Sequence, residues 1–412
     1  MNEKDLFRMA LGISEPWQVV KIEFNAESHR LDLYLDFPEG SNFPCPVCGK
    51  SCLVYDTDER SWRHLNFFEH LTYLHARLPR VKCDEHGVKT VGAPWARPGA
   101  GFTLLFEALI MTFAKNGMTP KAISRLAGEH DTRIWRVLEH YVEASRSRED
   151  FSSVSMVGVD ETSRAKGHTY VTLFADMERH KVIFTTEGKG HTTIESFRQD
   201  LEEHGGDALK ITDFSIDMSK AFIKGIAEKF ENAAITFDKF HVIKIINDAV
   251  DKVRRAEQTL CPELKRTRYV WLKNEGNHTD NQRGIYEELK DSTLKTARAC
   301  RIKNMLQKLY EQPAEDAPAH LKRRYFWATH SRLTPIIKAA KTIKAHWDGV
   351  MRWFESGLNN GFMEGINSLV QAAKAGAGGY RSTKKMKVMI YLIAGKSNFD
   401  LPRVMPRATH TK

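Results

Sequence analysis

The sequence contains no run of 18 uncharged apolar residues, which is about the length that a membrane-spanning helix needs. Its first residues, MNEKDLFRMALG, lack the apolar core of an export signal. Internal repeats and low-complexity tracts are missing as well. These absences argue against a membrane protein, an exported protein and a repeat protein, and we expect a cytoplasmic protein with no membrane partner.

Cysteine is scarce, with six among 412 residues, and four of the six fall within the first 83 residues. In a reducing compartment such a cluster is more often a metal site than a disulfide framework. Hydrophobic residues at 42% and charged residues at 28% are ordinary values for a folded protein. The length suits about two to four domains.

Charge is unevenly distributed along the chain. The formal net charge is +10, but residues 1–250 hold 31 basic and 37 acidic residues, whereas residues 251–412 hold 31 basic and 15 acidic residues. The positive charge therefore belongs to the second part of the chain. This asymmetry favours a polyanion as partner, although solvated Lys-rich helix faces give the same count.

Two short motifs indicate a metal site. Cys45-Pro-Val-Cys48-Gly and Cys83-Asp-Glu-His86-Gly are a CxxC and a CxxH pair separated by 34 residues. Ligands three positions apart on a tight turn can reach one tetrahedral ion, and the glycine permits the positive φ of the turn. The sequence predicts a zinc ribbon with a structural Zn²⁺. Two alternatives remain, a set in which Cys52 replaces one ligand and unligated thiols beside a surface histidine.

Residues 102–147 show a helical pattern with two breaks. Thr119 is a good N-cap and Pro120 suits the first position of the second helix. The third helix carries Arg133 and Arg136 near its start. This predicts a helix-turn-helix whose last helix enters the major groove of DNA, with both arginines as contacts. A plain three-helix bundle has the same spacing.

Strands are expected on both sides of this helical part. Residues 17–40 alternate apolar and polar residues as a hairpin does. Later, strands are expected at 154–159, 170–175, 182–186, 211–216 and 234–237, with helices at 193–204 and 220–230. This order describes a mixed sheet flanked by helices. Beyond residue 240 the pattern is almost wholly helical and basic.

Three acids are candidates for catalysis. Asp160 and Asp217 follow apolar strands, as oxygen ligands of Mg²⁺ often do, and Glu364 stands near the start of a helix. Each alone is weak, because a strand-end Asp is often a turn former or a helix cap. Together they suit two Mg²⁺ ions about 4 Å apart, which activate a nucleophile and stabilise the leaving oxygen of a phosphodiester. Asp213 is less favoured because it is expected two pleats away from Asp217, which is too far. Glu161 is less favoured because its side chain is expected on the opposite face from Asp160.

The order of zinc ribbon, helix-turn-helix, VGVDET, SIDMSKAF, FDKFHV and NNGFMEGINSLV resembles the DDE transposases of bacterial insertion sequences, in particular the IS-L-three family. The resemblance covers nearly the whole chain. It implies Asp160, Asp217 and Glu364 as the catalytic triad that binds Mg²⁺. The motif Asp238-Lys-Phe-His241 resembles the D-x-x-H of several transposase groups, which implies that His241 approaches the scissile phosphate or the metal-bound water. Simple helix capping by this pair is the alternative.

The resemblance also implies an α/β multidomain fold, in which an RNase H-like catalytic domain is interrupted by an all-α insertion. The 146 residues between Asp217 and Glu364 leave room for that insertion. We expect a β-rich zinc-ribbon domain at residues 1–98 and a helix-turn-helix domain at 99–150. The first part of the catalytic domain is expected at 151–249 and a basic all-helical insertion at 250–347. The C-terminal catalytic part, with Glu364 and a basic tail, is expected at 348–412.

Basic and aromatic residues of the second half are candidates for DNA contact. A basic cluster follows the Glu364 helix, and we expect DNA contacts from Lys374, Arg381, Lys384 and Lys385. Four tryptophans lie among the basic residues of the helical part, at Trp271, Trp327, Trp347 and Trp353. For each, a place in the helical core is favoured over stacking on an extruded base.

The main hypothesis is a bacterial, DNA-associated transposase. It binds terminal inverted repeats on double-stranded DNA and catalyses Mg²⁺-dependent strand cleavage and strand transfer, as a homodimer or higher oligomer in the synaptic complex. One alternative is a non-catalytic regulator that binds DNA through the same N-terminal modules. The other is an RNase H-fold nuclease that cuts without joining.

Overall fold

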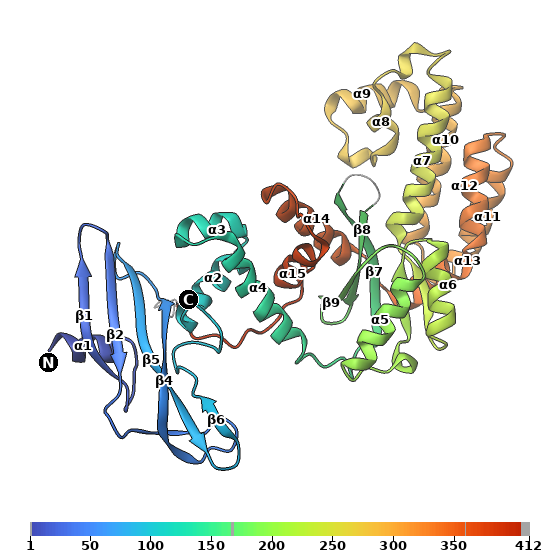
Figure 1. Cartoon of the computed structure of the whole chain (residues 1–412). Helices are drawn as coiled ribbons and strands as arrows, with labels where there is room; N and C mark the ends of the chain where they lie inside the picture. The colour runs from blue at the N-terminus through green and yellow to red at the C-terminus, as the bar shows by residue number, and fades with distance from the viewer. Residues whose placement is uncertain (1, 166–168, 359, 405–412) are drawn as a thin grey trace. The chain divides into compact units, whose positions relative to one another are not determined.

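The computed structural model describes residues 2–165, 169–358 and 360–404. The chain forms two compact units, one made of Met1–Glu143 with Asn398–Lys412 and the other of Ala144–Ser397 (Figure 1). In the described ranges, every helix is too short or too polar to cross a membrane.

The first unit begins with helix α1 (Glu3–Ala10) and a six-stranded sheet with the order β1-β2-β5-β4-β3, in which β6 pairs with β5. Its strands are β1 (Gln18–Asn25), β2 (Arg30–Asp36), β3 (Asn42–Pro44), β4 (Ser51–Arg63), β5 (Leu71–Cys83) and β6 (Gly87–Thr90). The predicted hairpin is confirmed as β1 and β2. A register shift after Val19 puts that side chain into the core and leaves Val20 42% exposed.

Three helices complete the first unit: α2 (Leu104–Lys115), α3 (Pro120–Ala127) and α4 (Asp131–Arg146), the last of which continues into the second unit. Thr119 caps α3 as predicted, because its hydroxyl accepts the Ala122 N–H at 3.2 Å, and Pro120 is the first helical residue. Gly128 ends α3 with a φ of 65°, a conformation that glycine adopts without strain. The buried side chains of Ile123 and Ile134 pack in this bundle.

The second unit contains a five-stranded sheet with the order β11-β10-β7-β8-β9. Its strands are β7 (Met156–Ala165), β8 (Thr169–Asp176), β9 (Lys181–Glu187), β10 (Asp213–Ile216) and β11 (Ala234–Phe237), with helices α5 (Thr192–Glu203) and α6 (Lys220–Lys229) between β9 and β11. Strands β7, β8 and β9 are antiparallel, whereas β10 runs parallel to both β7 and β11. A mixed sheet flanked by helices was predicted, and it is confirmed.

One expectation about this sheet is wrong. Asp160 does not end its strand, because β7 continues to Ala165 and pairs with β8 as far as Thr169. Val157 and Val159 before Asp160 are buried, whereas the residues after it are partly or fully exposed except for Thr162, which is 3% exposed. The change from apolar to polar residues does not end the strand, because the hairpin with β8 continues it.

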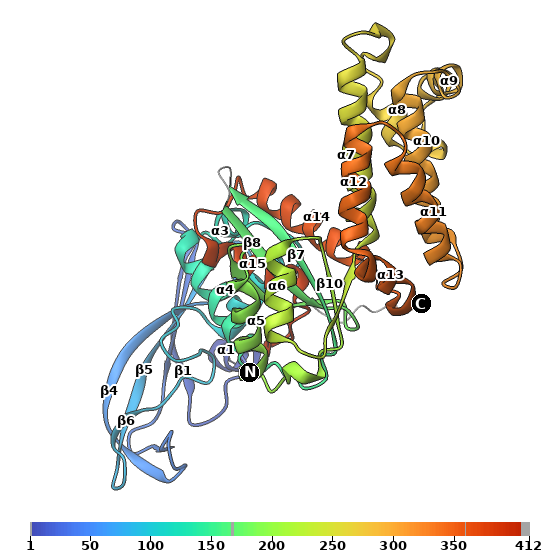
Figure 2. The same ribbon diagram turned by 90° about the vertical axis from the view of Figure 1, so that its right-hand side faces the viewer.

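Residues 239–356 are helical with short connections. The helices are α7 (Lys239–Glu257), α8 (Arg268–Leu272), α9 (Asp280–Leu289), α10 (Lys295–Gln307), α11 (Ala317–Thr329), α12 (Thr334–Ala345) and α13 (Trp347–Ser356). Both views show the long helix α7 leading away from the sheet with α12 beside it (Figures 1 and 2). The chain then returns to the sheet, where α14 (Gly361–Gly376) packs on β7 and α15 (Thr383–Ala394) packs on β9.

The contact between α13 and β11 depends on a glycine. A Cβ atom at Gly349 would lie 2.4 Å from two ring carbons of Phe237 and 3.0 Å from the carbonyl oxygen of Ile235. Such distances are shorter than van der Waals contact, so no larger residue fits here without moving the helix. Gly349 thus fixes how closely the end of the helical segment approaches the sheet.

We expect Gly349→Ala to lower the free energy of unfolding by about 1–3 kcal/mol, because it overpacks this contact. Gly284→Ala is the matched control, since a Cβ there meets nothing within 4 Å in α9. Alanine should stabilise that helix by about 0.5–1 kcal/mol. Calorimetric or urea unfolding measures both changes, and an unchanged stability of Gly349→Ala would contradict the close approach.

Candidate functional site

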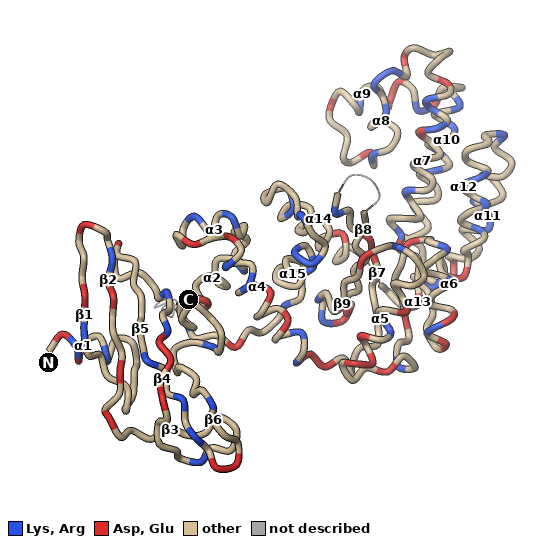
Figure 3. Tube along the Cα trace, viewed as in Figure 1, with Lys and Arg blue, Asp and Glu red and all other residues tan. Residues whose placement is uncertain are grey.

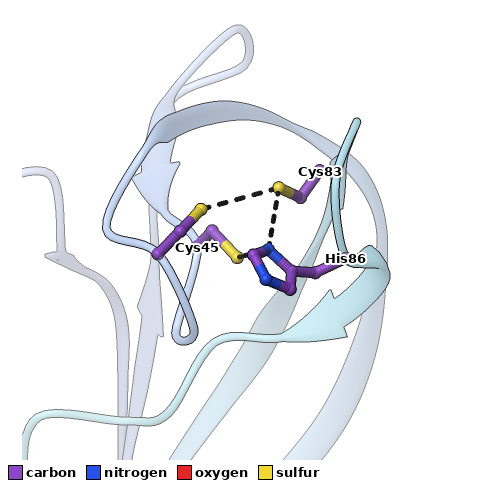
Figure 4. Close-up of side chains that lie close together, drawn as sticks. Cys45, Cys83 and His86 are labelled. Atoms are coloured by element: carbon purple, nitrogen blue, oxygen red, sulfur yellow. Dashed lines mark hydrogen bonds between the residues drawn. The ribbon is translucent and has the colours of Figure 1, made fainter.

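Four predicted zinc ligands come together in the first unit. The ligand atoms of Cys45, Cys48, Cys83 and His86 all lie within 4.8 Å of one another. Cys48 Sγ is 3.7 Å from Cys83 Sγ. His86 Nδ1 is 3.5 Å from Cys83 Sγ and 4.0 Å from Cys45 Sγ (Figure 4). Tetrahedral zinc, with bonds of about 2.3 Å to sulfur and 2.0–2.1 Å to nitrogen, separates its ligands by about 3.5–3.8 Å. The donor set and its spacing therefore fit Zn²⁺.

The local backbone explains this spacing. Cys45 and Cys48 lie in the turn between β3 and β4, and Cys83 and His86 lie at the turn between β5 and β6. Gly49 and Gly87 follow the two pairs with φ values of 72° and 67°, as the pattern predicted. Cys52 is outside the four-ligand group, and its thiol donates to the Lys50 carbonyl oxygen at 3.4 Å.

The strand register of the second unit brings three aspartates to one level. In the parallel pairing, Gly158 of β7 is opposite Ser215 of β10, so Asp160 and Asp217 both lie two residues further on. Ile216 is opposite Phe237 of β11, so Asp238 is level with Asp217. Neighbouring strands are about 4.8 Å apart. Asp238 is 1% exposed, whereas Asp160 and Asp217 are half-buried.

Helix α14 adds Glu364 and is held to β7 by polar contacts along one face. Asn367 Nδ2 donates to Asp160 Oδ2 at 2.7 Å, and one turn later Gln371 Nε2 donates to Thr162 Oγ1 at 2.7 Å. At the start of α14, Ser215 Oγ donates to Asn360 Oδ1 at 2.7 Å. These contacts fix the first turn of α14, which carries the exposed Glu364, beside the three aspartates.

Negative charge accumulates at this sheet edge. Burial raises the pKa of Asp160, and the charges of Asp217 and Asp238 add to the effect. Burial and then the charge of Asp238 raise the pKa of Glu364. Burial and the charge of Asp217 raise the pKa of Glu161 to about 7, so this set-aside acid belongs to the same electrostatic cluster. A cation at this edge would relieve the repulsion.

The carboxylates are less tightly grouped than the zinc ligands. Among the residues that the structure describes, no three of these acids have oxygen atoms within 4.8 Å of one another. One oxygen of Asp238, Oδ2, is buried without a hydrogen-bond partner, which is the kind of atom that a cation can satisfy. His241 follows Asp238 in the first turn of α7, and its charge opposes the rise in the pKa of Asp160.

Sequence reasoning missed some residues of this site. Tyr310 lines a pocket of ≈ 360 Å³ together with Asp238 and Glu364, and its hydroxyl is buried without a partner. A single Tyr in a helical segment gives no signal for such a place. Asp213, in contrast, pairs with Arg352, whose NH2 lies 2.9 Å from Oδ1. That pairing leaves Asp213 apart from the acidic cluster.

The residues expected to contact DNA differ in their surroundings. Arg133 pairs with Glu129, donates to the Gly101 carbonyl oxygen at 3.1 Å and lies over the Phe102 ring, whereas Arg136 is exposed. Lys374 Nζ donates to the Ser163 carbonyl oxygen at 2.6 Å. The remaining three lie just before α15 or in its first turn, at Arg381, Lys384 and Lys385 (blue in Figure 3).

For the zinc site we expect one zinc ion per chain. Replacement of both Cys45 and Cys48 by Ser should remove it, because two of four ligands are lost. Cys52→Ser is the matched control and should keep the metal. Elemental analysis of the purified variants measures the zinc content, and full occupancy in the double variant would exclude these ligands.

Two known transposases are similar to this chain over most of its length. The chain is 24% identical over 442 aligned residues to the transposase for insertion sequence element IS1557 of Mycobacterium tuberculosis (strain CDC 1551 / Oshkosh), with 98% of each chain covered. It is 26% identical to the transposase for insertion sequence element IS1001 of Bordetella parapertussis, over 90% of this chain and 94% of that one.

Three family descriptions match successive parts of the chain. Residues 41–86 match the zinc-finger of transposase IS204/IS1001/IS1096/IS1165, and residues 93–142 match the helix-turn-helix domain of transposase family ISL3. Residues 157–390, more than half of the chain, match the DDE transposase family ISL3. The resemblance inferred from the motifs is confirmed, and the chain belongs to the ISL3 (IS-L-three) family of transposases.

Proposed function

We propose that this chain binds the terminal inverted repeats of an insertion sequence and catalyses Mg²⁺-dependent strand cleavage and strand transfer. The observation that carries the proposal is the level placement of Asp160, Asp217 and Asp238 on three neighbouring strands, with Glu364 beside them on α14. Membership in a transposase family supports the reaction class.

We infer that the second unit is an RNase H-like catalytic domain interrupted by an all-α insertion. In support, three antiparallel strands are followed by two parallel ones, β10 and β11, on the other side of β7. The helices α7 to α13 then separate this sheet from α14. The insertion lies between the second Asp and the Glu, as the length of that interval indicated.

In this proposal Asp160, Asp217 and Glu364 would hold Mg²⁺. When bound, Mg²⁺ would supply Lewis acidity to the oxygens of the phosphodiester and would lower the pKa of the attacking hydroxyl. Asn367 keeps Asp160 oriented through the 2.7 Å hydrogen bond to Oδ2, which leaves Oδ1 beside the backbone N–H of Glu161. Asp238 and His241 complete the charge balance at the same edge.

The first unit supplies recognition of the transposon ends in this proposal. The zinc site joins two turns of the ribbon, and the helix-turn-helix presents the start of α4 to the major groove. Arg136 is the better candidate for a phosphate contact, since Arg133 already has an acid, a carbonyl oxygen and a ring as partners. Cleavage of two ends fits a homodimer or a higher oligomer.

We expect Asp160→Asn, Asp217→Asn and Glu364→Gln each to reduce cleavage of end-containing DNA by about 100-fold or more, because transition-state charge loses its stabilisation. The exposed Asp248→Asn on α7 is the matched control. Gel assays with Mg²⁺ measure cleavage and joining separately. Cleavage without joining would identify a nuclease. If the native chain binds end-containing DNA but neither cleaves nor joins it, the protein is a regulator.

We expect Arg136→Ala to weaken binding to end-containing duplex and to lower the slope of log K against log salt by about one. Arg133→Ala should instead reduce the melting temperature, because its contacts lie within the fold. Fluorescence anisotropy at several salt concentrations checks the first effect. Equal affinities of Arg136→Ala and the native chain would contradict the role of Arg136.

A further inference from the structure

A second pocket lies within the helical segment, apart from the acidic cluster. It has a volume of ≈ 690 Å³ and is bounded by α10 and α11 with their neighbouring turns. Its size lies within the range of about 300–1,000 Å³ that is usual for small-ligand sites. Cations line one side and aromatic rings the other, namely Arg298, Arg301, Lys308, Phe326, Trp327 and His330.

Two large aromatic side chains of the pocket are exposed to solvent. Phe326 is 58% exposed and Trp327 is 49% exposed, and the Phe326 ring stacks on His330 with a centroid distance of 4.1 Å. The other tryptophans of the helical segment are less exposed, since Trp347 and Trp353 are half-buried. Trp271 is fully buried, as predicted for a core tryptophan, and its Nε1 donates to Thr267 Oγ1 at 3.0 Å. The same prediction of a place in the helical core is wrong for Trp327, which is 49% exposed.

The cationic side follows one face of α10. Arg298 and Arg301 are three positions apart, and Lys308 continues the row after two further turns. All three are exposed, and in the part of the chain that the structure describes none of them forms an ion pair with a carboxylate. Arg301 donates from Nη1 to the Lys290 carbonyl oxygen at 2.6 Å, which leaves its charge without a counter-ion. The pocket has one acid, Glu275, which accepts the Tyr286 hydroxyl at 2.8 Å. Three cations against one carboxylate leave the pocket lining with an excess of positive charge.

Planar rings beside unpaired cations suit one ligand class. A nucleobase can stack on an exposed indole, while the flanking phosphates meet Arg or Lys. We propose that this pocket binds an unpaired nucleotide of a DNA strand, with its base on Trp327 and its phosphates on the α10 cations. This inference rests on the proposed function, since such a nucleotide arises where a DNA end is opened or cut.

The pocket gives the helical segment a preference for unpaired DNA in addition to its positive charge. Charge alone would hold any DNA backbone, and double-stranded DNA keeps its bases stacked and out of reach of Trp327. Ring stacking therefore selects single-stranded or frayed DNA over duplex. Another protein chain could also pack on the exposed rings, and the sedimentation of the DNA-free protein distinguishes that occupant.

The experiment measures binding rather than catalysis. A 16-nucleotide thymidine oligonucleotide with one central 2-aminopurine is titrated with the full chain carrying Asp160→Asn, in buffer without Mg²⁺. We expect quenching of 2-aminopurine on binding, and Trp327→Ala should weaken binding at least about fivefold, as loss of one stacked base does. Arg301→Ala should weaken it as well and lower the salt dependence.

Tyr269→Ala is the matched control, because Tyr269 is 55% exposed in the same helical segment but outside the pocket. It should bind the oligonucleotide like the parent chain. Circular dichroism of each variant checks folding. If Trp327→Ala binds and quenches like the control, the proposal is overturned.

Two other outcomes are decisive. Should Trp327→Ala change the sedimentation of the DNA-free protein while its oligonucleotide affinity stays the same, the pocket is a contact between chains and the proposal fails. If the native chain does not cleave end-containing DNA, the proposed function is overturned, but the oligonucleotide-binding assay is unaffected. Failure of the proposed function and failure of the nucleotide-binding proposal are therefore distinguishable.

Discussion

The parallel register of β7, β10 and β11 is the constraint on which the proposed active site depends. It sets Asp160, Asp217 and Asp238 at one level, although 56 residues separate the first two along the chain. A slip of one residue would turn each carboxylate to the other face of the sheet. The apolar side chains before Asp217 hold the register, because the same slip would move Phe214 and Ile216 out of the hydrophobic core to the opposite face.

The two proposed metal sites of the chain are organised differently. Three sulfur atoms and one nitrogen all lie within 4.8 Å of one another, close to the spacing of the ligands of a tetrahedral zinc ion. The carboxylates share a sheet edge but keep a wider spacing, and their burial and mutual repulsion raise the pKa of Asp160 and Glu364. The zinc ligands are thus grouped for one ion by the fold itself, whereas a cation between the carboxylates would also offset their repulsion.

Sequence reasoning succeeded where a local rule was sufficient. The CxxC and CxxH turns, the Thr119 cap and the strand before Asp217 follow from near neighbours, and all three are found in the structure. It failed where contacts between segments distant in the sequence determine the structure. The length of β7 depends on its pairing with β8, and the place of Tyr310 depends on a segment that folds back to α14. Neither contact leaves a periodic signal in the sequence.

The helical segment leaves the sheet directly after β11 and comes back to β11, where Gly349 meets Phe237. Its two ends are therefore neighbours in space, and the sheet does not determine how many residues lie between them. Helices can be gained or lost in this loop during evolution without a change in the pairing of the strands. Only the parts of the segment remote from the sheet have this freedom, because His241 and Tyr310 of the same segment lie at the acidic edge.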